Sequence, residues 1–476
     1  MTDHTTTFDP PPRRSTSSPS NGAVNHRASF AENLRHSPRS QRHPSFTQAA
    51  VQELLQHPPV SKPSDPRFAG RDWRSIHVGE LVQRSDVRWI ELDSSVEEAT
   101  KALIDQGPPN VILLRNNATD KTACDTFDFS DLNAYLLVVL GLANPAEAQR
   151  EQLIDLAKRA NAQQPISIRE ATSIAPKPPL TTLSESHDLS KATELFGSGV
   201  HRILICKEGT EEVVGILSQL KLVNFLWENA SSFPTLDQLY PAILRDLNIG
   251  TIQAISINGD RTLAEALQLM SSESLTSVAV VDNASNVIGN ISTADVKHLT
   301  TSKALPLFHS SCIHFISVIL SERGIGDGKD SFPVFYVNPY STLAHTVARL
   351  VATRSHRMWL VESASPSPSN PATPLSAPSM TYAGNPPTPG SNPISPSLSG
   401  SFPTSAVSAG ALPGARISGR LTGVISLTDI LNLFGRQSGL HPLSPNDQRS
   451  RRRRSSSSSV RPSIDSARGS SVDIRR

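Results

Sequence analysis

The stretch Ile291-Ser292-Thr293-Ala294-Asp295-Val296, preceded by Val-Ile-Gly-Asn, decides the fold. A short apolar strand runs here into Ser-x-x-Asp, which signals the start of a helix. Nearly the same string returns at Gly423–Ile430, where it reads Gly-Val-Ile-Ser-Leu-Thr-Asp-Ile. Two weaker copies stand at Gly215–Leu222, with Lys221 in place of the Asp, and at Thr126–Leu132, which keeps Asp131 but loses the Gly and the Ser. Four copies at long spacing indicate an internal repeat.

The residues around each copy predict one order of elements: strand, helix, strand, strand, helix. The third unit shows this order most clearly, with strands expected at 252–257, 278–281 and 287–291 and helices at 262–270 and 294–299. The pentapeptide Asp-Asn-Ala-Ser-Asn at 282–286 reads as the turn between its last two strands. The pattern therefore predicts an α/β (α+β) protein with units at about 86–142, 166–230, 247–300 and 331–435.

Composition separates these units from the rest of the chain. Residues 1–72, 363–416 and 436–476 are rich in Ser, Pro, Gly or Arg, and we expect them to be disordered. The segment 363–416 interrupts the fourth unit, and we expect a surface loop, because loop-closure entropy grows only logarithmically with length. In the first tail, residues 46–55 form an amphipathic helical pattern that packs either on its own domain or on a partner. We expect Trp73–Leu81 to be a lead-in segment that packs against the first unit.

Charge and cysteine content exclude several classes of protein. The 476 residues have a net charge of only +2, so no global field marks a nucleic-acid binder. Cys124, Cys206 and Cys312 are an odd number without CxxC spacing, and their apolar settings predict buried, reduced thiols. The N-terminus has no apolar signal-peptide core, and the longest apolar runs are too short to span a membrane. We expect a soluble intracellular protein.

The Ser-x-x-Asp ending has two interpretations. In the first, Ser or Thr stands at a helix start whose N–H groups favour an anion, and the Asp accepts the hydroxyls of a ribose. In the second, the motif is a capping box in which Asp295 reaches back to Ser292, and duplication would preserve such caps equally well. Both interpretations stay open. The candidate binding residues are Ser292, Thr293, Asp295, Ser426, Thr428, Asp429 and Asp131.

A second signature recurs in the even-numbered units. His201-Arg202 and His356-Arg357 each stand just before the second strand of their unit. The simplest interpretation of each pair is a solvated strand start, but the recurrence at the same place in two units favours a shared role. We keep all four residues as binding candidates, together with Lys221.

The repeat with its G-h-h-[ST]-x-x-D ending resembles the CBS domain, which works in tandem pairs. The resemblance covers about 86–435 without the insertion, and it implies that units one and two form one pair and units three and four the other, in a disc-like core. The His-Arg pairs resemble those of the gamma subunit of AMP-activated protein kinase, which contact nucleotide phosphates at a central channel and where a basic residue replaces one ribose aspartate. Lys221 stands in that slot, so we expect its site to lack ribose recognition, and its charge to face a neighbouring phosphate. AMP, ADP or ATP is the implied regulatory ligand, with no cofactor or metal required.

The chain as a whole resembles the fungal Sds-twenty-three/Moc-type CBS proteins. The residues that carry this resemblance are 88–99, 126–137, 215–219 and 224–227, and the Ser/Pro-rich ends and long insertion add to it. Membership implies a non-catalytic regulator of type 2A-like protein phosphatases, linked to mitotic progression, DNA replication, cell separation and nutrient stress. It also implies residence in cytoplasm and nucleus.

The tails carry candidate control sites. Phosphate adds negative charge and can create contacts with Arg in such segments. The Arg451–Arg454 run is a nuclear-import signal, a nonspecific anion patch or simply a solvated tail. The phosphorylation candidates, chosen for a following Pro or a preceding basic residue, are Ser15, Ser37, Ser45, Ser395, Ser444 and Ser455.

These observations favour a regulatory scaffold of four repeats. The family resemblance implies that it binds a phosphatase catalytic subunit, and such repeats also allow a homo-oligomer. The alternative is an adenine-nucleotide-sensing regulatory subunit of a protein kinase complex. An enzyme is not expected, because the sequence has no nucleophile–base pair, metal-spaced His/Cys cluster or phosphate-binding loop. Specific nucleic-acid or membrane partners are not expected either.

Overall fold

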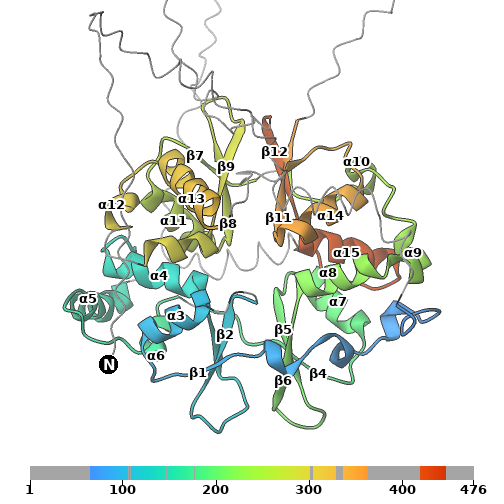
Figure 1. The fold of residues 1–476 in the computed structure, drawn as a ribbon, viewed down its shortest axis with the longest axis horizontal. Helices are drawn as coiled ribbons and strands as arrows, with labels where there is room; N and C mark the ends of the chain where they lie inside the picture. Colours follow the sequence, from blue (N-terminus) through green and yellow to red (C-terminus); the bar gives the residue numbers. More distant parts are fainter. Residues whose placement is uncertain are drawn as a thin grey trace, which may run out of the picture. The chain divides into compact units, whose positions relative to one another are not determined.

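The computed structural model describes residues 65–445, except 106, 108, 146, 176, 253, 301–303, 328–335 and 363–418. These residues contain four three-stranded sheets with strand orders β1-β2-β3, β4-β5-β6, β7-β8-β9 and β10-β11-β12 (Figure 1). In every sheet the first strand is parallel to the second, and the third is antiparallel to it. The predicted α/β fold of four CBS repeats is confirmed. The helix expected at 46–55 and the insertion 363–416 lie outside the described residues, as do all of 1–64 and 446–476.

Each repeat follows the predicted order, strand, helix, strand, strand, helix. Unit one has β1 (Trp89–Glu91), α3 (Val96–Asp105), β2 (Val111–Arg115), β3 (Asp125–Asp128) and α4 (Phe129–Val139). Unit two has β4 (Thr182–Ser184), α7 (Leu189–Gly197), β5 (Arg202–Cys206), β6 (Val213–Ser218) and α8 (Gln219–Glu228). Unit three has β7 (Ser256–Asn258), α11 (Leu263–Ser272), β8 (Ser277–Val281), β9 (Val287–Ser292) and η6 (Thr293–Leu299). Unit four has β10 (Tyr336–Val337), α14 (Leu343–Thr353), β11 (Arg357–Val361), β12 (Leu421–Ser426) and α15 (Leu427–Gln437).

Further helices and turns connect the units. The lead-in has three 3-10 turns, η2 (Trp73–Ser75), η3 (Val78–Leu81) and η4 (Arg84–Asp86). Units one and two are joined through α5 (Glu147–Asn161) and α6 (Ile168–Thr172). Units two and three are joined through η5 (Ala230–Ser232), α9 (Pro234–Asp237) and α10 (Leu244–Leu247). Units three and four are joined through α12 (Leu305–Phe308) and α13 (Cys312–Asp327).

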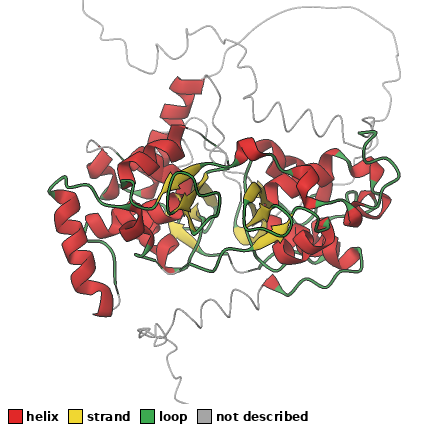
Figure 2. Ribbon diagram, turned by 90° about the horizontal axis from the view of Figure 1, so that it is seen from below, coloured by secondary structure: helices red, strands yellow, loops and turns green. Residues whose placement is uncertain are grey.

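The middle strand of each sheet is apolar because both of its faces are covered. All five residues of β8 are buried, and so are four of the five in β2. The last strand β9 alternates buried and half-buried residues, as expected for a strand at the edge of a sheet. Figure 2 shows the strands lying between helices, which cover one face of each sheet.

The second face of each sheet is covered by the sheet of the neighbouring unit. Val111 and Leu113 of β2 pack against Leu204 and Ile216 of unit two in one apolar cluster. Ala279 and Val287 of unit three pack against Trp359 and Val361 of unit four in another. Units one and two therefore form one pair and units three and four form the second, as the tandem pattern predicted.

Helices join one pair to the other through two larger cores. The first core combines side chains of α3 and α4 with those of α11, η6 and α13, so units one and three share it. The second combines α7 and α8 with α14 and α15, so units two and four share it. Buried amides cross both contacts: Asn133 Nδ2 donates to the Leu267 carbonyl at 3.2 Å, and Asn432 Nδ2 donates to the Gly197 carbonyl at 3.0 Å.

The lead-in packs against the second unit, so the prediction that Trp73–Leu81 packs on the first was wrong. Val78 N–H donates to the His187 carbonyl at 2.8 Å, and Leu189 N–H donates to the Ile76 carbonyl at 2.8 Å. Trp73, Ile76 and Val78 are buried in the core that units two and four share. The sequence placed the segment by proximity along the chain, but its apolar side chains fit beside α7.

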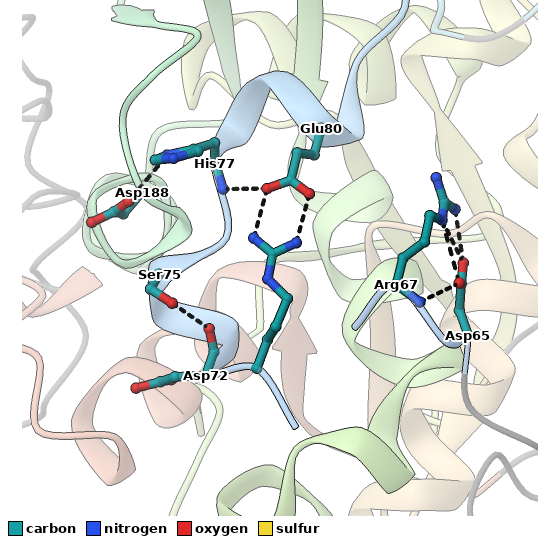
Figure 3. A network of polar contacts seen from close by, with 8 residues as sticks. Asp65, Arg67, Asp72, Ser75, His77, Glu80 and Asp188 are labelled. Carbon is teal, nitrogen blue, oxygen red and sulfur yellow. Dashed lines mark hydrogen bonds and ion pairs between the residues drawn. The ribbon is translucent and has the colours of Figure 1, made fainter. Parts of the chain in front are cut away.

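Polar contacts hold the lead-in in this position (Figure 3). The Glu80 carboxylate accepts a hydrogen bond from each terminal nitrogen of the Arg71 guanidinium, both at 2.8 Å. It also accepts one from the backbone N–H of His77 at 3.1 Å. His77 Nδ1 reaches Asp188 Oδ1 at 3.3 Å, at the start of α7. Exposed pairs of this kind contribute little individually, so the buried apolar side chains supply most of the stabilisation here.

The connectors also cross within each pair. Ile166 and Ile168, expected to open unit two, lie in the core of unit one, where Ile168 N–H donates to the Ser94 carbonyl at 2.9 Å. The strand expected at 252–257 is confined to β7, because Thr251 exchanges hydrogen bonds of 2.9 Å with Val424 of unit four. Ile252 is 85% exposed as a result. The helix expected at 294–299 is a 3-10 helix.

The expected insertion leaves and re-enters the fourth unit at a hydrogen-bonded pair. Glu362 N–H donates to the Arg420 carbonyl at 2.9 Å, next to the β11–β12 ladder. This bond continues the β11–β12 ladder as far as the residues next to 363–418. The cysteine prediction holds for two residues only: Cys206 and Cys312 are buried, whereas Cys124 is exposed, and all three are free.

We predict that Gly215→Ala destabilises the protein, because the new Cβ would lie 2.5 Å from the Cβ of Val82 in the lead-in. Overpacking of this kind costs about 1–3 kcal/mol. Urea unfolding measures the change. Val82→Gly removes the clashing side chain, so Gly215→Ala in that background should cost much less; an equal loss in both backgrounds would contradict this account of Gly215.

Candidate ligand site where the repeats meet

A cavity of about 280 Å³ lies where all four repeats approach one another. Antiparallel pairing explains why its residues converge, since the first residue of each second strand lies opposite the last residue of its third strand. Ser277 is opposite Ser292 in unit three, and Val111 is opposite Asp128 in unit one. The polar lining includes Asp128 and Ser130 of unit one, Arg202 of unit two, Ser292, Thr293 and Asp295 of unit three, and Arg354, His356 and Arg357 of unit four.

Both arginines of the His-Arg pairs reach across to the partner unit of their own pair. Arg202 Nη1 lies 2.7 Å from Asp128 Oδ2 of unit one. Arg357 Nη2 donates to Thr276 Oγ1 at 2.9 Å, and its Nη1 donates to the Ser277 carbonyl at 3.3 Å, both in unit three. Arg202 is thus paired with a carboxylate, while these contacts of Arg357 are with neutral oxygens.

The two histidines differ in position. His356 lines the cavity, whereas His201 is exposed and is not among the lining residues. The side chain of His356 is open to solvent on one side. Burial of the rest of the ring, and then the positive charges of Arg202 and Arg357, lower its pKa to about 4. His356 is therefore neutral at pH 7, and its imidazole can accept or donate a hydrogen bond at the cavity mouth.

The two well-preserved endings form the capping boxes that were one interpretation of the motif. Asp295 Oδ2 accepts from the Ser292 N–H at 2.8 Å and from its hydroxyl at 2.7 Å. Asp429 Oδ2 accepts from the corresponding groups of Ser426 at 2.8 and 2.6 Å. In both boxes the cap uses Oδ2, so capping does not prevent Oδ1 from accepting a ligand hydroxyl.

The structure does not bring all candidates together. Ser426, Thr428 and Asp429 are not among the residues that line the cavity. Thr428 is buried and its hydroxyl accepts from Gln219 Nε2 at 2.8 Å, across the contact between units two and four. Thr428 therefore has a structural partner already.

The two degenerate endings hold internal ion pairs. Asp131 Oδ1 lies 2.9 Å from Lys177 Nζ, and Asp131 Oδ2 accepts the Asp128 N–H at 2.9 Å. Burial, and then the negative charge of Asp128, raise the pKa of Asp131, and Lys177 opposes this shift. Lys221 Nζ lies 2.5 Å from Asp86 Oδ2 of the lead-in. The charge of Lys221 is thus paired with Asp86, and the approach of Lys221 to a phosphate stays a prediction.

Sequence reasoning missed Asp128, Lys177 and Asp86. Asp128 precedes the motif position, and Lys177 and Asp86 lie outside the repeat pattern altogether. The available signal was weak: Lys177 stands in the string Pro-Lys-Pro-Pro, and prolines fix the backbone around it. Of the phosphorylation candidates, Ser444 is described and is exposed. Ser15, Ser37, Ser45, Ser395 and Ser455 lie outside the described residues.

Two features are absent from the residues that the structure describes. No helix among them is long and apolar enough to cross a membrane. Within the same ranges, no group of three or more His, Cys, Asp or Glu side chains is placed to hold a metal ion.

Comparison with known proteins places the chain in a family. The CBS domain model matches residues 168–228 and 245–300. Protein sds23 of Sclerotinia sclerotiorum is 72% identical over 477 residues, covering 99% of this chain and 86% of the relative. The chain belongs to the sds23 family. The sds23 protein of Botryotinia fuckeliana is 71% identical over 99% of the chain and 97% of its own length, and that of Pyricularia oryzae is 54% identical over 95% and 90%.

A solved structure supports the fold of this sds23 family member. Protein MJ1225 from Methanocaldococcus jannaschii, described as a candidate archaeal homologue of g-AMPK, matches with a TM-score of 0.50. The match covers 75% of this chain and 100% of the archaeal chain, at 12% sequence identity. At this identity the similarity concerns the fold alone.

We predict that Arg202→Met lowers the free energy of unfolding by about 1–3 kcal/mol at pH 7, because it leaves Asp128 partly buried without its cation. In the wild type, burial raises the pKa of Asp128, but Arg202 outweighs it and holds that pKa below 3.8. The pair therefore stabilises the fold above about pH 4, and this contribution is lost as pH falls through the lowered pKa.

In the variant, no guanidinium group opposes the effect of burial, so the pKa of Asp128 should rise above its usual value. The loss of stability should then be small near pH 3 and grow as pH rises towards 7, as followed by urea unfolding at each pH. Arg202→Lys keeps the charge and is the matched control. A loss that does not change with pH would show that Arg202 acts through packing instead.

Proposed function

We propose that this sds23-family protein is a non-catalytic regulator that binds an adenine nucleotide in the cavity between its repeats. The observation that carries the proposal is the meeting of Asp295 with Arg202, Arg354 and Arg357 around one cavity. A carboxylate can accept ribose hydroxyls, and guanidinium groups bind phosphate oxygens with paired hydrogen bonds. The three guanidinium groups outnumber the carboxylates of Asp128 and Asp295 at the lining, which favours an anionic ligand.

Three basic side chains of the lining have different roles in this proposal. Arg357, which also bonds the Thr276 hydroxyl and the Ser277 carbonyl, would contribute a guanidinium group to the phosphate. Arg202 is partly neutralised by Asp128 and would add less. The neutral imidazole of His356 would hydrogen-bond the ligand without adding charge.

The regulatory target that we propose is a type 2A-like protein phosphatase catalytic subunit. This part of the proposal rests on membership of the sds23 family, which implies regulation of such phosphatases. The implied processes are DNA replication, mitotic progression, cell separation and stress response, and the implied compartments are the cytoplasm and the nucleus. The second candidate is a regulatory subunit of a protein kinase complex. The His-Arg pairs favour that alternative, because they are the feature that resembles the gamma subunit.

We predict that AMP, ADP or ATP binds the full chain, and that Asp295→Ala and Arg357→Met each weaken binding by about tenfold or more, the effect of losing one charged hydrogen-bond partner. Isothermal titration calorimetry measures the affinities. Arg150→Met, on the exposed face of α5, removes the same charge away from the cavity and should leave binding unchanged. Absence of heat and of thermal shift with all three nucleotides at millimolar concentration would refute nucleotide binding.

Affinity purification of the tagged full chain from fungal cells tests the partner. We expect the catalytic subunit of a type 2A-like phosphatase to be enriched over an untagged control. Enrichment of kinase alpha and beta subunits without a phosphatase would instead support the kinase alternative.

A further inference from the structure

The first pair of repeats carries two internal ion pairs at equivalent positions. Asp131 and Lys221 each occupy the third helical residue, in α4 and α8 respectively. Each pairs with a residue on a segment that precedes the first strand of the other unit: Lys177 precedes β4, and Asp86 precedes β1. The two pairs are therefore related by the pseudo-symmetry of the repeats, but their charges are reversed.

Lys177 is held firmly beside Asp131. Its Nζ lies 2.9 Å from Asp131 Oδ1, 2.5 Å from the Thr126 carbonyl oxygen and 3.6 Å from Asp125 Oδ1. Its side chain is 20% exposed, and that of Asp131 is 7% exposed. Pro178 and Pro179 follow it directly and restrict the backbone. The ammonium group therefore occupies the acceptor side of the carboxylate that a ribose would need.

Asp86 reaches Lys221 because the lead-in crosses closely over β6. Gly215 allows this approach, since any Cβ there would overlap Val82. The next turn, η4, ends at Asp86, whose carboxylate lies 2.5 Å from Lys221 Nζ. Both side chains are about one-third exposed, 34% for Lys221 and 35% for Asp86.

The second pair differs from the first at the segment that crosses the last strand of its second unit, which is the position of the lead-in in the first pair. The segment that crosses β12 is Gly250–Ile252, which bridges Val424 and carries no charge. Gly423 permits this crossing, as Gly215 does in the first pair. Among the residues that the structure describes, no cation forms an ion pair with Asp429. The motif aspartate of unit four thus keeps its carboxylate without the internal cation that covers Asp131.

We propose that Lys177 and Lys221 determine where the ligand binds. They block the sites at the motif positions of units one and two, which we call the two slots of the first pair, and so confine nucleotide to the second pair. This inference rests on the proposed function, whose ligand it assigns to units three and four. At Asp131 the lysine replaces the ribose hydroxyls, and a ligand would have to break a largely buried ion pair. At Lys221 the motif carboxylate is absent, and Asp86 both neutralises the lysine and repels phosphate.

The test opens each slot separately in the full chain and counts bound AMP by native mass spectrometry at about pH 8. Lys177→Met uncovers Asp131, and Lys177→Arg is the matched control that keeps the cation. The double variant Lys221→Asp with Asp86→Ser restores Ser218-x-x-Asp without a facing charge. Because the Lys221–Asp86 pair is one-third exposed, this second variant provides a test even if Lys177→Met fails to fold, which thermal unfolding would reveal.

We expect each opened slot to bind one AMP more than the wild type, and Lys177→Arg to bind the wild-type number. Folded variants that gain no AMP overturn the inference, whether or not the wild type binds. Wild-type binding that is lost in Asp131→Asn also overturns it, because the first pair would then be occupied. If an opened slot binds AMP while the wild type binds none, the lysines do close the first pair, but the wild-type protein does not bind nucleotide. The failure of this inference and the failure of the proposed function are therefore distinguishable.

Discussion

The structure depends on one constraint: a three-stranded sheet with helices on one face leaves its other face uncovered. Each repeat here meets this constraint by packing its sheet against that of its neighbour, through Val111, Leu113, Leu204 and Ile216 in the first pair. The same contact in the second pair uses Ala279, Val287, Trp359 and Val361. A single repeat could not bury these side chains, so the pair is the smallest unit that makes physical sense.

Exchange of connecting segments strengthens each pair and also differentiates the two. The lead-in packs on unit two and the connector at Ile166 packs on unit one, so each unit is completed by residues that precede the other. These crossings run close to the motif helices and bring their own side chains with them. In the first pair they bring Asp86 and Lys177, whereas the crossing over β12 brings uncharged residues. At the crossing that the structure describes in both pairs, the first pair therefore carries a charged side chain and the second does not.

The cavity between the repeats combines groups that are far apart in the chain. Arg202 of unit two reaches Asp128 of unit one, and Arg357 of unit four reaches Thr276 of unit three, because the two sheets of each pair pack against each other. The capping box and the ribose-binding interpretation are compatible here, since the cap at Ser292 uses Oδ2 of Asp295. Capping through Oδ2 therefore does not decide between the two roles, which explains why the motif alone cannot distinguish them.

The sequence by itself determined the elements that depend on local order. The periods of strands and helices, the helix starts at Ser292 and Ser426, and the turn at 282–286 all follow from neighbouring residues. The repetition of the motif indicated four units, and the resemblance to the CBS domain implied that they form two pairs. Tertiary structure alone decided that Trp73 packs on unit two, that Thr251 pairs with Val424, and that Lys177 covers Asp131. These contacts join segments with no shared pattern, and they are selected by the shape and charge of surfaces that exist only after the repeats have packed.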